Sequence, residues 1–411
     1  MSAFLALMVV AYLGSILMGG RSIRGYGLPS GSEYLVLGWI LGPGVLRWLG
    51  TGTLELFEPM LQVGTSWLAL IAGIGWGVVQ SSERKLVTLL ASVSLALFTT
   101  LLVGTGVYWA IGWLWPLPDR ERLLLAAAVA ATGTETTRVA VRWVFERHGA
   151  DGPLSRWIAA LADSDELPAL LLVAVLFVLV PMPSGRVELP AWGWLGITLG
   201  LGAVLGLTCT ALMGDQLHRG EATSFLLGAT LLGTGVCVQL GLAGITALFV
   251  TGLTLSATTR HKVALRAILA KTEAPVMLPV LVLAGAHVDA TAVKGAPWLI
   301  AAALGGRLLA KWLCGLLLLS FPAARPAGPT LGFGLLSSGV VTISMGMALS
   351  LRLGGEVGTI VLTFAAASAL FGEALGPYFL RRALMRVGEL RPSDTVDART
   401  QLGEREGEAL P

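Results

Sequence analysis

Three acidic side chains lie close together in an otherwise apolar stretch of the sequence. Asp163, Asp165 and Glu166 fall within one turn of a helix, and apolar runs at 154–161 and 167–180 flank them. Each charge inside a membrane helix costs roughly 2.5–3.5 kcal/mol on insertion scales, so three together need partners or a use. A solvated loop is the alternative, but the apolar runs leave little room for one. The sequence therefore favours an acidic site within a membrane span.

Two basic side chains lie one helical turn apart in another apolar stretch. Arg307 and Lys311 occupy positions i and i+4 of the segment GGRLLAK, so they share one helix face. Either side chain could instead extend its charge toward the helix end. The functional interpretation pairs this basic face with the acids at 163–166, which would neutralise both. The sequence leaves open whether Lys311 or Arg307 is the partner of Asp165.

A third polar run, TGTETTR at 132–138, contains an acid and hydroxyl side chains. Glu135 and Arg138 are i,i+3 neighbours, so one interpretation is a local ion pair between them. The other interpretation makes Glu135 part of a cation site, together with oxygen atoms of Thr134 and Thr136.

The elements that must position these residues are membrane helices. Of the 411 residues, 55% are hydrophobic and 13% are charged, and the mean hydropathy is +0.78. A soluble protein of this size carries roughly twice that charge. Runs longer than roughly 18 apolar residues mark membrane spans, and we expect about thirteen, or twelve if the two around 240–241 form one bent span. The expected spans are 3–19, 32–49, 57–79, 86–114, 122–146, 154–181, 191–213, 222–239, 241–257, 273–288, 296–320, 329–351 and 356–383.

The distribution of basic residues predicts the orientation. Lys and Arg are more frequent in the odd-numbered loops than in the even-numbered ones, so the odd loops are expected to face the cytoplasm. The protein is thus expected in a cell inner membrane, with its N-terminus on the outer side and its C-terminus in the cytoplasm. The transmembrane domain is expected at 1–385, and a short polar cytoplasmic tail at 386–411. The basic segment 260–271 is expected to lie along the inner membrane surface.

Two spans depart from a plain apolar pattern at their centres. The run at 132–138 falls in the fifth span, and a run rich in Ser, Thr and Gly at 337–344 falls in the twelfth. Interrupted spans at matching places in two halves indicate a transporter with inverted repeats. Irregular backbone at membrane depth is tolerated only where it lines a cavity or is buried in protein. The expected fold is therefore an all-α polytopic membrane protein with inverted repeats, whose two broken, crossing helices form the binding site where their breaks meet.

Over nearly its whole length the chain resembles the sodium/proton exchanger superfamily, and specifically the second monovalent cation:proton antiporter family. The segment 33–46 (EYLVLGWILGPGVL) is similar to the family's apolar helix that ends in Gly-Pro. The segment 241–256 (GLAGITALFVTGLTLS) is similar to a marker helix of its second half. The segment 285–289, Pro297 and Lys311 follow the family's spacing from a Gly-x-x-x-Asp segment to a membrane lysine.

The acidic cluster also resembles a motif of this family. From Glu135 through Glu146 to Glu166, the chain follows the family's broken helix, Arg-x-x-x-Glu turn and acidic pair. This register assigns the pair to Asp165 and Glu166, with Glu166 at the place of the ion-binding carboxylate, where the family usually has Asp. A shift of one residue would make Ser164 and Asp165 the pair.

The resemblance implies exchange of a monovalent cation for protons by alternating access, in a homodimer. Sodium is the expected cation, with potassium or lithium as alternatives. A buried carboxylate can bind either ion, because desolvation favours its protonated form and a nearby cation favours its charged form. The residues expected to bind the cation or proton are Asp163, Ser164, Asp165, Glu166, Glu135, Thr134 and Thr136. Among them, Asp165 and Glu166 are the expected metal-ion ligands, with Lys311 or Arg307 as the ion-pair partner.

Three other functions are alternatives to cation/proton exchange: symport, intramembrane proteolysis and passive conduction. A cation-coupled symporter of a small organic solute would use the same fold but needs a larger, partly apolar pocket. An intramembrane aspartyl protease is disfavoured, because the only Gly-Asp pair, at 214–215, falls in a loop. A passive channel would show flux without proton dependence. We expect no enzymatic activity, no cofactor and no nucleic-acid partner; the expected partners are the ions, the bilayer and a second copy of the chain.

Overall fold

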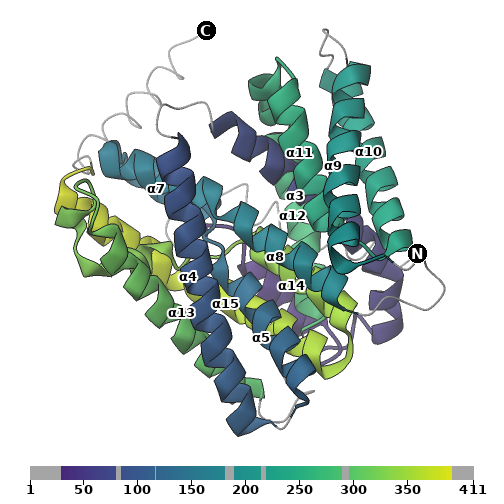
Figure 1. Ribbon diagram of the computed structural model, residues 1–411, viewed down its shortest axis with the longest axis horizontal. Helices are drawn as coiled ribbons and strands as arrows, with labels where there is room; N and C mark the ends of the chain where they lie inside the picture. The colour runs from purple at the N-terminus through teal and green to yellow at the C-terminus, as the bar shows by residue number, and fades with distance from the viewer. Residues whose placement is uncertain are drawn as a thin grey trace, which may run out of the picture.

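The structure is a computed structural model that describes residues 29–79, 85–115, 117–180, 189–213, 219–288 and 296–390. Throughout these ranges the regular structure is helical (Figure 1). The expected first span at 3–19 and most of the expected tail, 391–411, lie outside the described residues.

The first half of the described chain forms three long helices and several shorter ones. Its helices are α2 (Glu33–Leu41), α3 (Thr51–Val79), α4 (Lys85–Leu114), α5 (Asp119–Thr134), α6 (Arg138–His148), α7 (Pro153–Ser164), α8 (Glu166–Leu179) and α9 (Ala191–Met213). The second half also combines long and short helices. Its helices are α10 (Arg219–Leu240), α11 (Gly244–Thr258), α12 (Lys262–Ala286), α13 (Ala296–Leu318), the 3-10 helices η1 (Arg325–Ala327) and η2 (Pro329–Leu335), α14 (Val340–Leu353) and α15 (Gly355–Val387).

The expected spans that fall on described residues each contain a helix or consecutive short helices, although in the span expected at 32–49 only Glu33–Leu41 is helical. Among the described helices, seven are long and apolar enough to cross a membrane alone: α3, α4, α9, α10, α12, α13 and α15. An eighth span is possible from η2 and α14, which bend by 61° at their break. The other expected spans consist of shorter helices, because polar residues interrupt them or because the apolar run itself is short.

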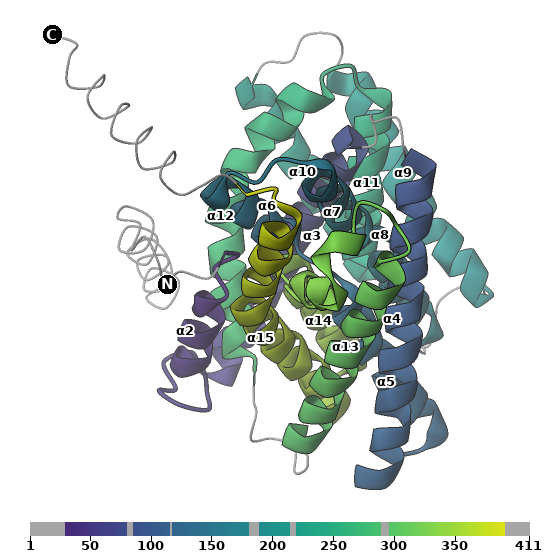
Figure 2. The same cartoon turned by 90° about the vertical axis from the view of Figure 1, so that its left-hand side faces the viewer.

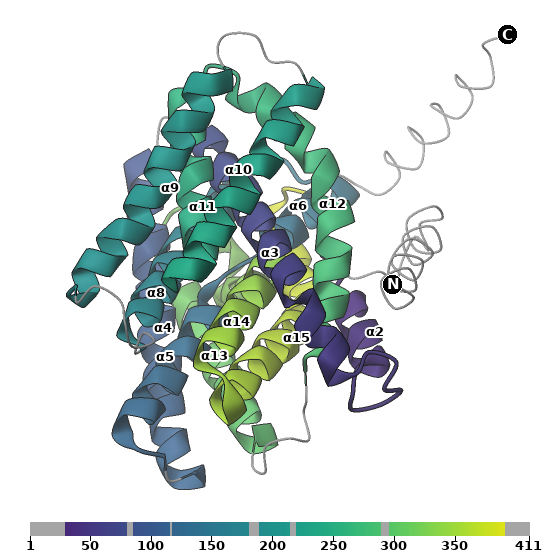
Figure 3. The same ribbon diagram turned by 90° about the vertical axis from the view of Figure 1, so that its right-hand side faces the viewer.

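The basic segment 260–271 is continuous with the span that follows it, because α12 runs without a break from Lys262 to Ala286. The one-span alternative around 240–241 is wrong. Gly241 has a φ of 64°, and beyond it α11 turns back along α10, so that a Cβ atom at Gly233 would lie 3.2 Å from the Leu248 side chain (Figure 3).

The helices form two bundles. The broken-helix bundle contains α4 to α8 and α13 to α15 with η1 and η2, and the second bundle contains α2, α3 and α9 to α12 (Figures 1 and 3). Glycines allow very close packing in the second bundle, where α3 meets α11. A Cβ atom at Gly73 would lie 2.1 Å from the Phe249 carbonyl oxygen, and one at Gly252 would lie 2.2 Å from that of Leu70. Small residues at such contacts let membrane helices pack backbone against backbone.

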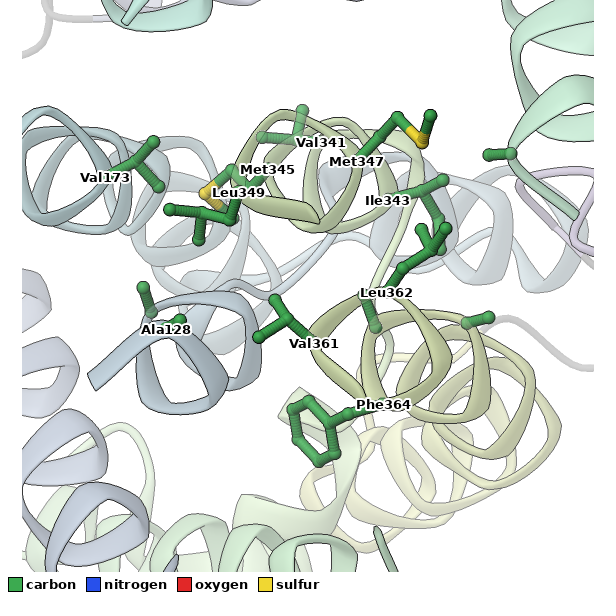
Figure 4. Close-up of a cluster of buried hydrophobic side chains, with 14 of the residues drawn as sticks. Ala128, Val173, Val341, Ile343, Met345, Met347, Leu349, Val361, Leu362 and Phe364 are labelled. Carbon is green, nitrogen blue, oxygen red and sulfur yellow. The ribbon is translucent and has the colours of Figure 1, made fainter. Parts of the chain in front are cut away.

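Apolar side chains hold α14 inside the broken-helix bundle. Figure 4 shows Met345 and Leu349 of α14 on the side that faces Val173 of α8, while Val361 of α15 points toward Ala128 of α5. All five side chains are buried. This packing fixes the position of α14 relative to α5, and so brings the polar ends of the two broken helices together.

The breaks in the two interrupted helices are in direct contact. The first break, 135–137, separates α5 from α6, and the second, 336–339, separates η2 from α14. The Thr137 amide donates a hydrogen bond of 2.8 Å to the Ser337 carbonyl oxygen. Gly339 is needed here, since a Cβ atom at this position would lie 2.3 Å from the Thr137 hydroxyl oxygen. The expectation that the two breaks meet is confirmed.

Candidate functional site

Each break leaves helix ends inside the protein, with backbone groups that lack partners within their helix. The N-terminal amides of a helix attract negative charge, and its C-terminal carbonyls attract positive charge. Glu135 binds the amides at the N-terminal end of α14. Its Oε2 atom accepts hydrogen bonds from the Gly339 amide at 3.3 Å and the Thr342 amide at 3.1 Å, and also from the Thr342 hydroxyl. The carboxylate of one broken helix thus caps the start of α14 in the other.

Two basic residues of α13 bind the carbonyl groups at the C-terminal end of α5. Arg307 donates from Nε to the Gly133 carbonyl at 2.8 Å and from Nη2 to the Glu135 carbonyl at 3.1 Å. Lys311 donates from Nζ to the Thr134 carbonyl at 2.9 Å. Both side chains are buried, so neither extends its charge to the end of α13. They bind the carbonyls that α5 presents at its break.

Asp165 lies at the junction of α7 and α8 and faces the first break. Its Oδ2 atom accepts a hydrogen bond of 3.0 Å from the Thr136 amide, just before α6 begins. Its Oδ1 atom is buried and has no hydrogen-bond partner among the described residues. Asp165 lines a cavity of about 20 Å³ together with Lys311, Thr134 and Thr136. A space of that size holds about one water-sized ligand.

Asp165 and Lys311 line the same cavity, but the expected ion pair between Asp165 and a base of α13 is not a direct contact, because no charged nitrogen of α13 lies within 4.0 Å of the carboxylate. Across the described chain, neither Lys311 nor Arg307 forms an ion pair with this carboxylate. Thr136 lies between the two charges, because its amide binds Asp165 while its hydroxyl accepts a 2.9 Å hydrogen bond from Lys311. The reason is the break itself, whose carbonyls offer the bases nearer partners than the carboxylate does.

The other two acids of the cluster pair with arginines of α6. Arg142 Nη2 lies 3.1 Å from Asp163 Oδ2, and Arg138 Nη1 lies 3.3 Å from Glu166 Oε2. Arg138 also reaches Glu273 of α12, in the second bundle, at 3.8 Å. Asp165 is therefore the acid of this cluster that keeps an oxygen atom available within the cavity.

The local pair expected between Glu135 and Arg138 is wrong. The i,i+3 rule holds only within a helix, and residues 135–137 are not helical. The two side chains therefore find separate partners, Thr342 for Glu135 and Glu166 for Arg138. The i,i+4 spacing of Arg138 and Arg142, opposite a pair of acids, is a sequence signal that could have revealed this pairing. Glu273 carries no comparable local signal.

The hydroxyl side chains of the expected site are partly engaged by their own helices. Ser164 Oγ donates to the Ala160 carbonyl at 2.7 Å, and Thr134 Oγ1 lies 2.8 Å from the Ala130 carbonyl. The structure thus brings Thr134, Thr136, Asp165 and Lys311 together around one cavity. Ser164, Asp163 and Glu166 do not line it.

Together, the packed breaks and the buried charges define a multi-pass membrane protein with the fold of a sodium/proton antiporter. The fold is similar to that of the sodium proton antiporter MjNhaP1 from Methanocaldococcus jannaschii. Its structure at pH 8 matches with a TM-score of 0.70 and 17% sequence identity, over 95% of this chain and 99% of that one. An electron-microscopy structure of MjNhaP1 matches with a TM-score of 0.67 and 17% identity, over 96% and 99% of the two chains. No protein-family model and no curated protein sequence matches the chain.

Proposed function

We propose that this protein exchanges a monovalent cation for protons across a membrane by alternating access. The observation that carries the proposal is the Asp165 carboxylate. Thr136 holds one of its oxygen atoms in place, while the other is buried without a described partner in a cavity beside Lys311. Such a carboxylate can be neutralised by a proton or by a cation, and each excludes the other. This competition is the minimum that coupled exchange requires.

The ligands of the cation follow from the oxygen atoms nearby. Asp165 is the proposed charged ligand, and Thr134 and Thr136 line the same cavity. Glu135 Oε1 is a second buried carboxylate oxygen that has no partner among the described residues. Glu166 is held by Arg138, so it joins the site only if that pair opens. These ligands suit sodium, lithium or potassium, and sodium is the cation we propose.

The proposal also includes the transport motion, a homodimer and an orientation in the membrane. Alternating access requires the broken-helix bundle to move against the second bundle, so that the site faces each side in turn. The homodimer rests on the family resemblance. The inner-membrane location, with the N-terminus outside and the C-terminus in the cytoplasm, rests on the distribution of basic residues in the loops.

Proton movement in proteoliposomes tests this function. Addition of sodium, lithium or potassium chloride to vesicles with a trapped pH-sensitive dye is expected to drive proton flux through the wild-type protein. Asp165→Asn is expected to abolish it. Asp163→Asn is the matched control, because that acid is bound to the half-exposed Arg142 and lies outside the cavity. Full exchange by Asp165→Asn would overturn the proposal.

A second function, cation-coupled uptake of a small organic solute, has one observation in its favour. A mostly apolar cavity of about 230 Å³ lies between α3 and α10–α11 of the second bundle and α8 and α14 of the other, and Gln62 and Arg352 are among its lining residues. Pockets for organic ligands usually measure about 300–1,000 Å³, so this one is small for the purpose. Cation-dependent uptake of a labelled solute by the same vesicles would support this alternative over exchange.

A further inference from the structure

A serine of α4 shares the cavity of Asp165. Ser92 is 1% exposed and lines the cavity of about 20 Å³ that Asp165 and Lys311 also line. Its helix lies alongside α5 and α13, which bring Thr134 and Lys311 to the same place (Figure 2). The cavity thus has a wall that neither of the two breaks supplies.

The Ser92 hydroxyl has no hydrogen-bond partner within the part of the chain that the structure describes. A hydroxyl side chain in a helix often donates to the carbonyl four residues earlier, as Thr105 of the same helix donates to Leu101 at 2.7 Å. Ser92 Oγ makes no such bond, and Asp165 Oδ1 in the same cavity also lacks a described partner. Buried polar atoms are nearly always satisfied, so two exceptions that line one cavity indicate a ligand between them.

The threonine hydroxyls that line this cavity are already bonded to other parts of the protein. Thr134 Oγ1 donates to a carbonyl of its own helix at 2.8 Å. Thr136 Oγ1 donates to a carbonyl of η2 at 3.1 Å and accepts a 2.9 Å bond from the lysine of α13. Thr99 Oγ1 lies 3.4 Å from a thiol of α13. Ser92 is therefore the hydroxyl of the described lining whose oxygen is fully available to a ligand.

We propose that Ser92 is a ligand of the transported cation, which lies between the serine hydroxyl oxygen and Asp165 Oδ1. This inference rests on the exchange function proposed above, and it adds α4 to the helices that form the site. A hydroxyl oxygen has two lone pairs, so it can bind a cation without a charge of its own. Asp165 provides the negative charge, and Ser92 provides a neutral oxygen in place of hydration water.

Sodium titration of exchange by the full-length protein in proteoliposomes tests this ligand. Ser92→Ala removes one oxygen ligand and should raise the half-saturating sodium concentration about tenfold. The rate of exchange at saturating sodium should change less, because Asp165 is still present. Ser94→Ala is the matched control, since Ser94 is an exposed serine of the same helix and does not line the cavity. Its half-saturating sodium concentration should equal that of the wild-type protein.

Thermal stability in detergent distinguishes a ligand from a serine that only supports the fold. In choline chloride without sodium, Ser92→Ala should melt at the wild-type temperature or above it, because its hydroxyl has no described partner to lose. In sodium chloride at the same ionic strength, its melting temperature should rise less than that of the wild-type protein. The reason is that a ligand of the folded state stabilises it according to its affinity.

Two sets of results would overturn the inference, and they separate it from the proposed function. If exchange depends on Asp165 but Ser92→Ala leaves the half-saturating sodium concentration unchanged, the ligand beside Ser92 is water and the inference alone fails. The inference also fails alone if Ser92→Ala melts below the wild-type protein without sodium, or if Ser94→Ala loses as much affinity. Absence of sodium-driven proton flux in the wild-type protein, or full exchange by Asp165→Asn, would overturn the proposed function and the role of Ser92 with it.

Discussion

Arg307 and Lys311 occupy the same face of α13 but bind different atoms, and this difference can be tested by replacing each with methionine. Arg307 donates two good hydrogen bonds to carbonyls at the end of α5, at 2.8 and 3.1 Å. Lys311 donates to one carbonyl of α5 and to the Thr136 hydroxyl, both at 2.9 Å. We predict that Arg307→Met destabilises the protein more than Lys311→Met does.

The magnitude follows from the acceptors that each substitution leaves unsatisfied. A hydrogen bond to a charged group contributes roughly 1.5–3 kcal/mol, so loss of Arg307 should cost about 3–6 kcal/mol for its two carbonyls. Loss of Lys311 leaves one carbonyl without its donor, while the Thr136 hydroxyl keeps its own bond to the Leu335 carbonyl. The expected cost for Lys311 is therefore about 1.5–3 kcal/mol.

Thermal denaturation in detergent, with and without sodium, measures both effects. Sodium should restore part of the stability of Lys311→Met, because a cation bound at Asp165 supplies positive charge to the same cavity. It should not restore Arg307→Met, whose vacant partners are the Gly133 and Glu135 carbonyls. The exposed Arg382 on α15 provides a control, and Arg382→Met should change stability by less than about 0.5 kcal/mol.

Two results would refute this reasoning. One is a greater loss of stability in Lys311→Met than in Arg307→Met. The other is equal recovery of both variants in sodium. The first result would mean that Lys311 contributes more than Arg307 to holding the end of α5, and the second that the cation site is coupled to both bases.

Three further predictions concern the other buried charges. Glu135→Gln removes the negative charge at the start of α14 and should lower stability by about 1–2 kcal/mol in thermal denaturation; an unchanged melting temperature would contradict the capping role. In double-mutant cycles, Arg138 should couple more strongly to the buried Glu166 at 3.3 Å than to the partly exposed Glu273 at 3.8 Å. Equal coupling energies would count against the geometry. The Glu389 carboxylate accepts hydrogen bonds of 2.8 and 2.7 Å from amides in the first turn of α7, so Glu389→Gln should speed hydrogen exchange there, and unchanged rates would exclude this cap.

Much of the fold could be predicted because its signals are local. Apolar runs of sufficient length located the helices, since the bilayer requires continuous apolar sequence. The polar runs at 132–138 and 337–344 located the two breaks, because Gly, Ser and Thr in mid-span supply both backbone freedom and replacement hydrogen bonds. Their matching positions in the two halves then predicted that the breaks would meet, as the Thr137–Ser337 hydrogen bond shows.

The partners of the charged residues could not be predicted in the same way. The sequence identified Glu135, Asp165, Arg307 and Lys311 as functional candidates. It paired Asp165 with a base at 307 or 311 by simple neutralisation, and one interpretation paired Glu135 with Arg138 by local spacing. The tertiary structure instead directs the two bases to the carbonyls of a helix that ends about 170 residues earlier, and Glu135 to Thr342. Composition alone establishes that a charge inside the membrane needs a partner, because desolvation is costly wherever it occurs. Which partner it finds depends on distances of a few ångströms between distant segments, and only the packing of the helices sets those distances.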